Sequence, residues 1–144
     1  QSIELLESKK DHVEVQYLQE LTGSTQFSKI IIDELSRNLN LHTDFGRLEI
    51  DLLKSDFETF DLSTKSTEVS VRLARDSRYK LDVDAPDDRL SFPDIWQQFL
   101  GDDDPDTDNK TVGENRIVRG TIGEGTIKSQ FLLRGQGGHI QIQD

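Results

Sequence analysis

The chain has 144 residues, of which 33% are hydrophobic and 31% are charged, and its 17 Lys and Arg residues against 28 Asp and Glu residues give a net charge of -11. This length is typical of one domain, so we expect residues 1–144 to form a single domain. The acidic balance argues against a nucleic-acid partner and against an anionic membrane surface, because both carry negative charge. The absence of cysteine excludes disulfides, thiolate nucleophiles and cysteine-bound metals.

The chain also lacks methionine and contains no apolar run of about 18 residues, the length that a membrane-spanning helix needs. We therefore expect no transmembrane segment in this chain. A start at Gln1 without an initiator methionine predicts a processed chain, such as one from which a signal peptide has been removed.

Residues 1–37 show incomplete alternation of apolar and polar residues, which predicts irregular β-strands. The apolar positions of the first stretch are Ile3, Leu5, Val13, Val15 and Tyr17. After the turn residues 22–25, Phe27, Ile30 and Ile32 predict a buried strand.

A clear repeat follows, in which one twelve-residue pattern occurs twice at a spacing of 21 positions. The first copy reads Leu39-x-Leu41-x-Thr43-x-x-Gly46-x-Leu48-x-Ile50, and the second reads Phe60-x-Leu62-x-Thr64-x-x-Thr67-x-Val69-x-Val71. Each copy predicts two short strands with one buried face, joined by a tight corner. A strand-only repeat near 20 residues is typical of a β-solenoid.

Two further copies extend this repeat. Tyr79-x-Leu81-x-Val83 followed by Leu90-x-Phe92 is a third copy, with a corner around Pro86 that we interpret as two residues wider. A last copy runs from Phe131 to Ile142 and places Gly138 where Gly46 stands, which predicts a positive φ or a close backbone approach. We therefore expect an all-β fold, a right-handed parallel β-solenoid of roughly six or seven turns with an axis about 30 Å long.

Residues 93–115 interrupt the repeat with a predicted helix and an acidic loop. Pro93-Asp94 can begin a helix that carries Ile95, Trp96 and Phe99 on one face. This apolar face covers an open end of the fold, or it presents Trp96 and Phe99 to a partner, because exposed tryptophan is favoured at binding hot spots.

The acidic loop after this helix contains Asp104, Asp106 and Asp108 at alternate positions. Alternate carboxylates in a loop can converge on calcium, but the glycine and glutamate that complete a calcium loop are replaced by Asn109 and Asn115. We expect a solvated acidic loop with calcium binding as the alternative, and no other cofactor.

A carboxylate group on the outer face is the candidate for catalysis. Asp82 and Asp84 alternate with buried residues, and Asp61 should lie on the neighbouring turn near Lys80. Polysaccharide lyases and hydrolases use such carboxylates, but every solenoid fills its outward positions with charged residues. We therefore expect no enzymatic activity.

The corner Thr43-Asp-Phe-Gly-Arg-Leu-Glu-Ile50, its looser copies at residues 63–71 and 133–142, and the glycine-containing stretch 120–125 resemble an adhesin-like β-solenoid domain family of bacteria, common in Bacteroidetes. Members repeat a T-S-Y-G-x-I-x-I corner, and here Asp44 replaces Ser and Phe45 replaces Tyr. The resemblance covers residues 27–144. It implies export to the periplasm or outer cell surface, and it brings no catalytic residues.

These observations lead to one functional hypothesis and two alternatives. We expect a non-enzymatic cell-envelope module that binds a glycan or protein of the envelope or of a host. The first alternative is an accessory protein of envelope stress signalling that binds a membrane regulator through Trp96. The second is the polysaccharide lyase or hydrolase, acting through Asp82 and Asp84.

Overall fold

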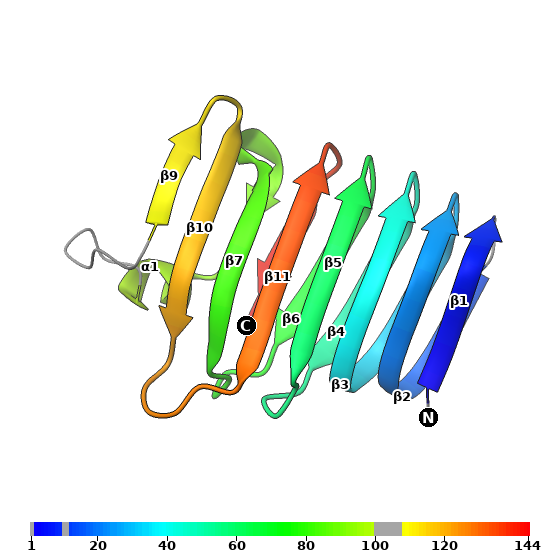
Figure 1. The fold of residues 1–144 in the computed structure, drawn as a ribbon, viewed down its shortest axis with the longest axis horizontal. Helices are drawn as coiled ribbons and strands as arrows, with labels where there is room; N and C mark the ends of the chain where they lie inside the picture. The colour runs from blue at the N-terminus through cyan, green and yellow to red at the C-terminus, as the bar shows by residue number, and fades with distance from the viewer. Residues whose placement is uncertain (1, 10–11, 100–107) are drawn as a thin grey trace.

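The computed structural model describes residues 2–9, 12–99 and 108–144, and strands form most of it (Figure 1). Its strands are β1 (Ser2–Lys9), β2 (His12–Gln26), β3 (Lys29–Asp44), β4 (Arg47–Leu53), β5 (Thr59–Lys65), β6 (Glu68–Leu73), β7 (Tyr79–Pro86), β8 (Leu90–Ser91), β9 (Asp108–Val112), β10 (Asn115–Ile122), β11 (Ser129–Gln136) and β12 (Ile140–Gln143). Two short helices, η1 (Asp87–Arg89) and α1 (Asp94–Phe99), complete the described elements. The expected all-β class is confirmed.

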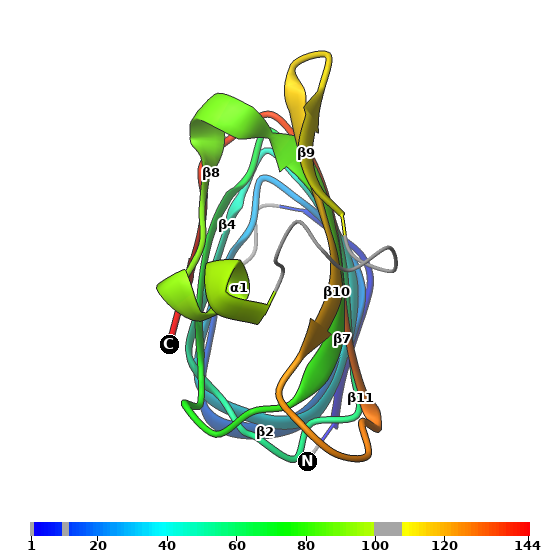
Figure 2. The same ribbon diagram turned by 90° about the vertical axis from the view of Figure 1, so that its left-hand side faces the viewer.

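The strands form one curled, mostly parallel sheet in the order β8-β12-β6-β4-β3-β5-β11-β7-β10-β9, with β2 also pairing β3 and β1 pairing β2. The curl arises in the long strands. Residues 29–35 of β3 pair with β4, whereas residues 38–44 of the same strand pair with β5. Viewed along its length, the sheet therefore curves around a narrow interior (Figure 2). The pairs β7–β10 and β9–β10 are antiparallel.

The register predicted from the 21-residue repeat is confirmed. Leu39 lies beside Phe60, and Leu48 lies beside Val69. All four side chains are buried, whereas the residues on either side of each along its strand are at least partly exposed. We call two strands and the corner that joins them a rung. Successive rungs thus bury equivalent residues against one another.

The third copy has a different register from the predicted one. Leu81, not Tyr79, is equivalent to Phe60, because Phe131 of β11 pairs with Phe60 on one side and with Leu81 on the other. Leu90 likewise aligns with Val69 through Ile140. The 21-residue spacing therefore holds, and the expected widening of the corner near Pro86 was wrong. The alternation from Tyr79 to Ala85 continues for four buried positions, so local pattern alone could not fix the starting one.

The last copy does not follow the third copy in space. β11 lies between β5 and β7, and β12 lies between β6 and β8. The last rung in the chain therefore fills the gap between two earlier rungs (Figure 1). All sheet pairing between β1–β6 and β7–β10 passes through this inserted rung.

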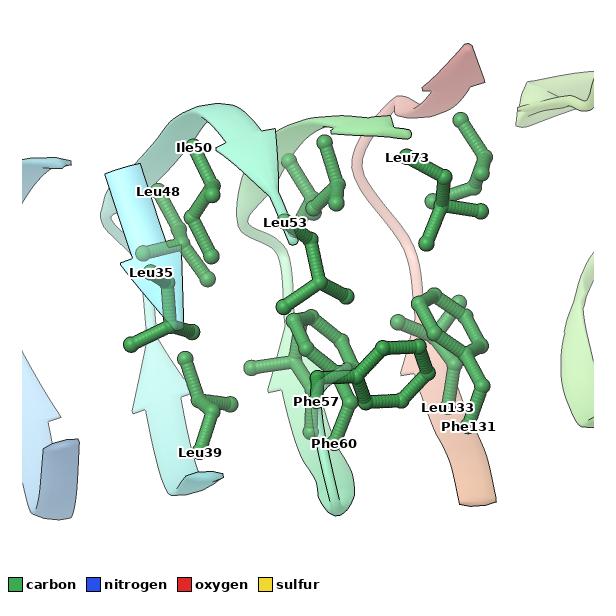
Figure 3. Close-up of a cluster of buried hydrophobic side chains, with 14 of the residues drawn as sticks. Leu35, Leu39, Leu48, Ile50, Leu53, Phe57, Phe60, Leu73, Phe131 and Leu133 are labelled. Carbon is green, nitrogen blue, oxygen red and sulfur yellow. The ribbon is translucent and has the colours of Figure 1, made fainter. Parts of the chain in front are cut away.

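Side chains from the rungs form a continuous core along the interior (Figure 3). The rings of Phe60 and Phe131 stack with centroids 4.5 Å apart and planes 2° from parallel. The Tyr79 ring lies 6.0 Å from the Phe131 ring and 5.9 Å from the Phe57 ring. These aromatic contacts join the inserted rung to both of its neighbours.

One end of the interior is covered by α1, which lies across the opening (Figure 2). The expected helix therefore exists, but it is only six residues long. The part of the predicted acidic loop from Asp108 onward instead forms β9, which pairs with β10. Tyr17 also differs from the prediction. Its side chain is 68% exposed and Leu18 is buried in its place, because Tyr17 pairs with the partly exposed Glu34 and Leu18 pairs with the buried Leu35.

Candidate functional site

One corner of the sheet forms a row of residues with left-handed backbone, along the upper edge in Figure 1. Phe27, Phe45, Ser66 and Gly137 occupy equivalent positions in four successive rungs, with φ of 54°, 55°, 48° and 78°. Backbone hydrogen bonds connect them: the N–H groups of Phe27, Phe45 and Ser66 donate to the carbonyls of Asp44, Lys65 and Gln136 at 3.0, 2.9 and 2.8 Å. We call these four residues the corner ladder.

Two residues of the corner ladder are bulky, strained and exposed. A left-handed conformation costs a residue other than glycine about 1–3 kcal/mol. Phe27 and Phe45 are nevertheless 57% and 48% exposed, and their rings stack at 5.4 Å with planes 14° apart. Glycine would make the same corner with less strain, as Gly137 does. The two rings therefore contribute little to the fold that glycine could not, which makes them the candidate functional residues.

The residue after each ladder position lies close to the neighbouring rung. Ser28, Gly46, Thr67 and Gly138 fill these positions. A Cβ at Gly46 would lie 2.3 Å from the Ser28 carbonyl oxygen, and one at Gly138 would lie 2.3 Å from that of Thr67. The predicted close approach at both glycines is confirmed. The Thr67 hydroxyl donates to the Thr43 carbonyl at 3.0 Å.

Charges around the two rings are balanced. The Lys65 ammonium lies 5.9 Å from the Phe45 ring centroid, and Asp44 is its neighbour across the strands. Arg47 lies 3.0 Å from Glu49 and 3.6 Å from Glu68. The rings thus lie among charges of both signs.

An open polar groove of about 810 Å³ continues the corner ladder at the end opposite the two aromatic rings. Ser66 and Gly137 belong to both features. The groove also takes residues from three other segments: Pro86, Asp87, Asp88 and Arg89 around η1, the hairpin residues Thr111, Gly113, Glu114 and Asn115, and Gln136 and Gly138 of the inserted rung. The site as a whole is therefore an apolar ridge followed by a groove that offers mainly oxygen acceptors.

Trp96 is buried, in contrast to the interpretation as an exposed partner contact. Its side chain is 0% exposed, its indole Nε1–H donates to the Tyr79 hydroxyl at 2.7 Å, and its ring stacks on Phe92. The end-covering alternative agrees with this burial. The side chain of Phe99 lies outside the described residues. The signalling alternative thereby loses the contact residue on which it depended.

We expect Trp96→Phe to destabilise the protein by about 1–3 kcal/mol, because it leaves the Tyr79 hydroxyl buried without its donor. Chemical denaturation of Trp96→Phe, Tyr79→Phe and the double variant measures this. The double variant should lose less stability than the sum of the two single variants. Strict additivity would contradict the hydrogen bond.

The predicted calcium residues give no site in the described part of the chain. Asp104 and Asp106 lie outside the described residues, and the backbone of Asp108 begins β9. Among residues that the structure describes, no three His, Asp or Glu side chains come together to hold a metal ion. Within the same residues, no helix has the length and apolar content to cross a membrane.

The outer-face carboxylates are engaged in contacts between strands. Asp82 accepts from Arg119 Nε at 3.1 Å and from Arg134 Nη2 at 2.9 Å, and Asp84 accepts from Asn115 at 2.9 Å. Burial alone would raise the pKa of Asp82, but the two arginines outweigh it and hold this pKa below its usual range. A low pKa suits an ion pair rather than a general acid.

The expected approach of Asp61 to this group was wrong. Leu132 of the inserted rung lies between Asp61 and Asp82 in the register. Lys80 pairs with Gln130, and Gln130 pairs with Thr59. The four residues therefore do not form one carboxylate cluster.

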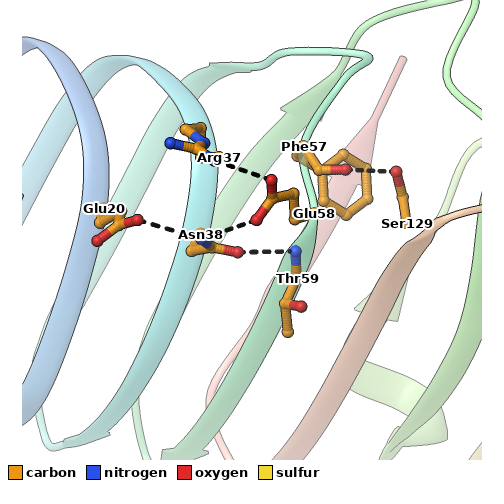
Figure 4. Close-up of polar contacts among 7 residues, drawn as sticks. All are labelled: Glu20, Arg37, Asn38, Phe57, Glu58, Thr59 and Ser129. Carbon is orange, nitrogen blue, oxygen red and sulfur yellow. Dashed lines mark hydrogen bonds and ion pairs between the residues drawn. The ribbon is translucent and has the colours of Figure 1, made fainter.

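Polar residues at the opposite, lower edge connect rungs to one another (Figure 4). Arg37 donates to Glu58 at 3.0 Å, and the Asn38 amide bonds Glu20 at 3.4 Å and Glu58 at 3.3 Å. The hydrogen bonds from Arg37 and Asn38 lower the pKa of Glu58. The Ser129 hydroxyl donates to the Phe57 carbonyl of the neighbouring rung. These hydrogen bonds connect neighbouring rungs, so we assign the residues that form them to the stability of the fold.

Sequence reasoning assigned Phe27 to a buried strand and treated Phe45 only as part of a corner motif. The structure brings the two exposed rings together because residues 29–35 pair with residues 47–53. The available signal was the equivalence of Phe27-Ser28 and Phe45-Gly46, an aromatic residue followed by a small one at a spacing of 18.

No protein-family model, curated protein or solved structure matches the chain.

Proposed function

We propose that this chain is a non-enzymatic, adhesin-like binding module of the bacterial cell envelope, and that it binds a glycan through the corner ladder. The observation that carries the proposal is the stacked, exposed pair Phe27 and Phe45 in left-handed backbone. Strained backbone that the fold does not require is typical of functional positions. Exposed aromatic rings can cover the apolar C–H face of a sugar ring, which removes nonpolar surface from water.

We infer that the curled sheet is a β-solenoid, with the right-handed winding that the repeat predicted. The constant 21-residue spacing from Leu39 to Phe60 and Leu81 supports this inference. In a solenoid, equivalent residues of successive turns form straight rows on the surface. Such rows suit a linear ligand.

We also propose that the protein acts in the periplasm or on the outer cell surface. This part of the proposal rests on the resemblance of the corner Thr43–Ile50 to the adhesin-like family. A glycan of the envelope or of a host is accordingly the proposed partner.

The test is to replace both rings by glycine and to measure glycan binding and stability together. Phe27→Gly/Phe45→Gly should lower affinity by at least about tenfold. Stability should change by no more than about 1–2 kcal/mol, because the relieved strain offsets the lost ring contact of about 0.5–1.5 kcal/mol. Binding to immobilised glycans and thermal unfolding give the two readouts.

Tyr17→Ala is the matched control, since Tyr17 is an exposed aromatic residue outside the corner ladder. It should leave binding unchanged. A folded double-glycine variant that binds glycans as the unmodified protein does would overturn the assignment of the site.

A further inference from the structure

We infer that the ligand is an uncharged linear glycan that lies lengthwise along the corner ladder and continues into the polar groove, with successive sugar units over successive rungs. This inference rests on the proposed function and specifies its ligand. Four features of the described residues carry it: the direction of the ladder, its spacing, its division into an aromatic and a polar half, and the local charge.

The direction follows from the hydrogen bonds of the ladder. Each of the residues Phe27, Phe45 and Ser66 donates its backbone N–H to the next rung, so the four ladder residues form one row across the strands. The groove begins at Ser66 and Gly137, where this row ends. A ligand that covers both rings and enters the groove must therefore run along the row.

The spacing favours sugars over an extended peptide. Neighbouring strands lie about 4.8 Å apart, and a pyranose unit of an extended glycan is of similar length. An extended peptide advances only about 3.3 Å per residue. Equivalent groups of a glycan can thus meet equivalent ladder positions, whereas a peptide would fall out of register.

The two halves of the site suit the two kinds of surface of a sugar. Phe27 and Phe45 offer exposed nonpolar surface to a C–H face. The groove offers hydroxyl, amide and carboxylate oxygens, including those of Ser66, Gln136 and Glu114. Hydroxyl groups of a sugar can donate to such acceptors and can accept from the amide of Gln136.

The local charge disfavours a polyanionic glycan. Around the rings, the cationic Lys29, Arg47 and Lys65 are balanced by Asp44, Glu49 and Glu68. The groove contains Asp87, Asp88 and Glu114 against Arg89, and Arg116 lies 3.5 Å from Asp87. The chain as a whole carries a net charge of -11. A carboxylated chain would meet no net positive charge on its path, so an uncharged chain is favoured.

The experiment is calorimetric titration with oligosaccharides of two to six units. The neutral probes are β-1,4-linked oligomers of glucose, xylose and N-acetylglucosamine, and the charged probe is the glucose series oxidised to carboxylates. We expect affinity for at least one neutral series to rise with length and to level off near four or five units. The carboxylated chains should bind at least about tenfold more weakly.

Gln136→Ala tests the groove half, and Gln130→Ala is its matched control on the outer face of the same strand. Gln136→Ala should weaken binding of the longest oligomers about three- to tenfold and leave disaccharides unaffected, whereas Gln130→Ala should change neither. Thermal unfolding of both variants separates binding from stability.

The outcomes distinguish failure of this inference from failure of the proposed function. Binding that does not depend on length, or that Gln136→Ala leaves unchanged, would overturn the extended path and leave the proposed function intact. Equal or tighter binding of the carboxylated series would overturn the uncharged ligand. Failure of every series to bind would overturn both this inference and the proposed glycan-binding function.

Discussion

Removal of residues 129–144 is expected to release β7 to β10 from the rest of the fold. All sheet pairing between β1–β6 and β7–β10 passes through β11 and β12. The deletion also removes Phe131, whose ring packs on Phe60, Tyr79 and Trp96 at 4.5, 6.0 and 6.1 Å. Without it, β5 and β7 have no strand between them, and the core of this region opens to water.

Hydrogen exchange gives the clearest measurement of this effect. Amides of β7 and β10 should lose their protection in the shortened chain, whereas amides of β3 and β4 should keep more of theirs, because those strands still pair with each other. Addition of a peptide of residues 129–144 should restore part of the protection in β7.

Two point variants provide a matched test in the full-length chain. Phe131→Ala should cost about 3–5 kcal/mol, since Phe131 is fully buried. Leu132→Ala, on the outward side of the same strand, should cost much less. Retention of full protection in β7 and β10 after the deletion would show that the inserted rung does not join the two parts.

The strands of the repeat could be predicted from the sequence because their register depends on local alternation. Leu39, Leu41, Leu48 and Ile50 are buried at every second position on either side of a corner, and the second copy repeats this at 21 residues. The two-residue periodicity of a strand indicates which face is buried. The pairing of the two copies then follows from their equal spacing.

The position of the last rung could not be predicted in the same way. Phe131 to Ile142 match the first two copies equally well, so the pattern does not state which rung they contact. Neighbours in sequence are usually neighbours in space, and that expectation places the last copy at the end. Here β9 and β10 extend the sheet first, and the last copy pairs with β5 and β7 instead.

The candidate site could not be predicted from the sequence for a related reason. Phe27 is apolar and stands before a buried strand, so its sequence context favours burial. Its left-handed backbone turns the side chain out of the alternation, a conformation that is uncommon for a residue other than glycine. Trp96 is the opposite case, because the sequence allowed an exposed side chain and the short helix instead places it inward, against Tyr79.

The second large effect is expected from a charge placed in the stacked core. Leu48 is 0% exposed and Val69, its partner across the strands, is 3% exposed. Leu48→Asp or Val69→Asp would bury a carboxylate among apolar side chains. Each should destabilise the protein by about 4 kcal/mol or more, because apolar burial is lost and the new charge is desolvated.

Glu49→Ala and Ser70→Ala are the matched controls, because these residues are the outward neighbours of Leu48 and Val69. Both should change stability by less than about 0.5–1 kcal/mol. Thermal unfolding separates the two sets, since about 4 kcal/mol corresponds to a lowering of the melting temperature by more than about 10 °C in a domain of this size. Similar melting temperatures for the inward and outward substitutions would contradict the register itself, and with it the row of corner residues on which the proposed site depends.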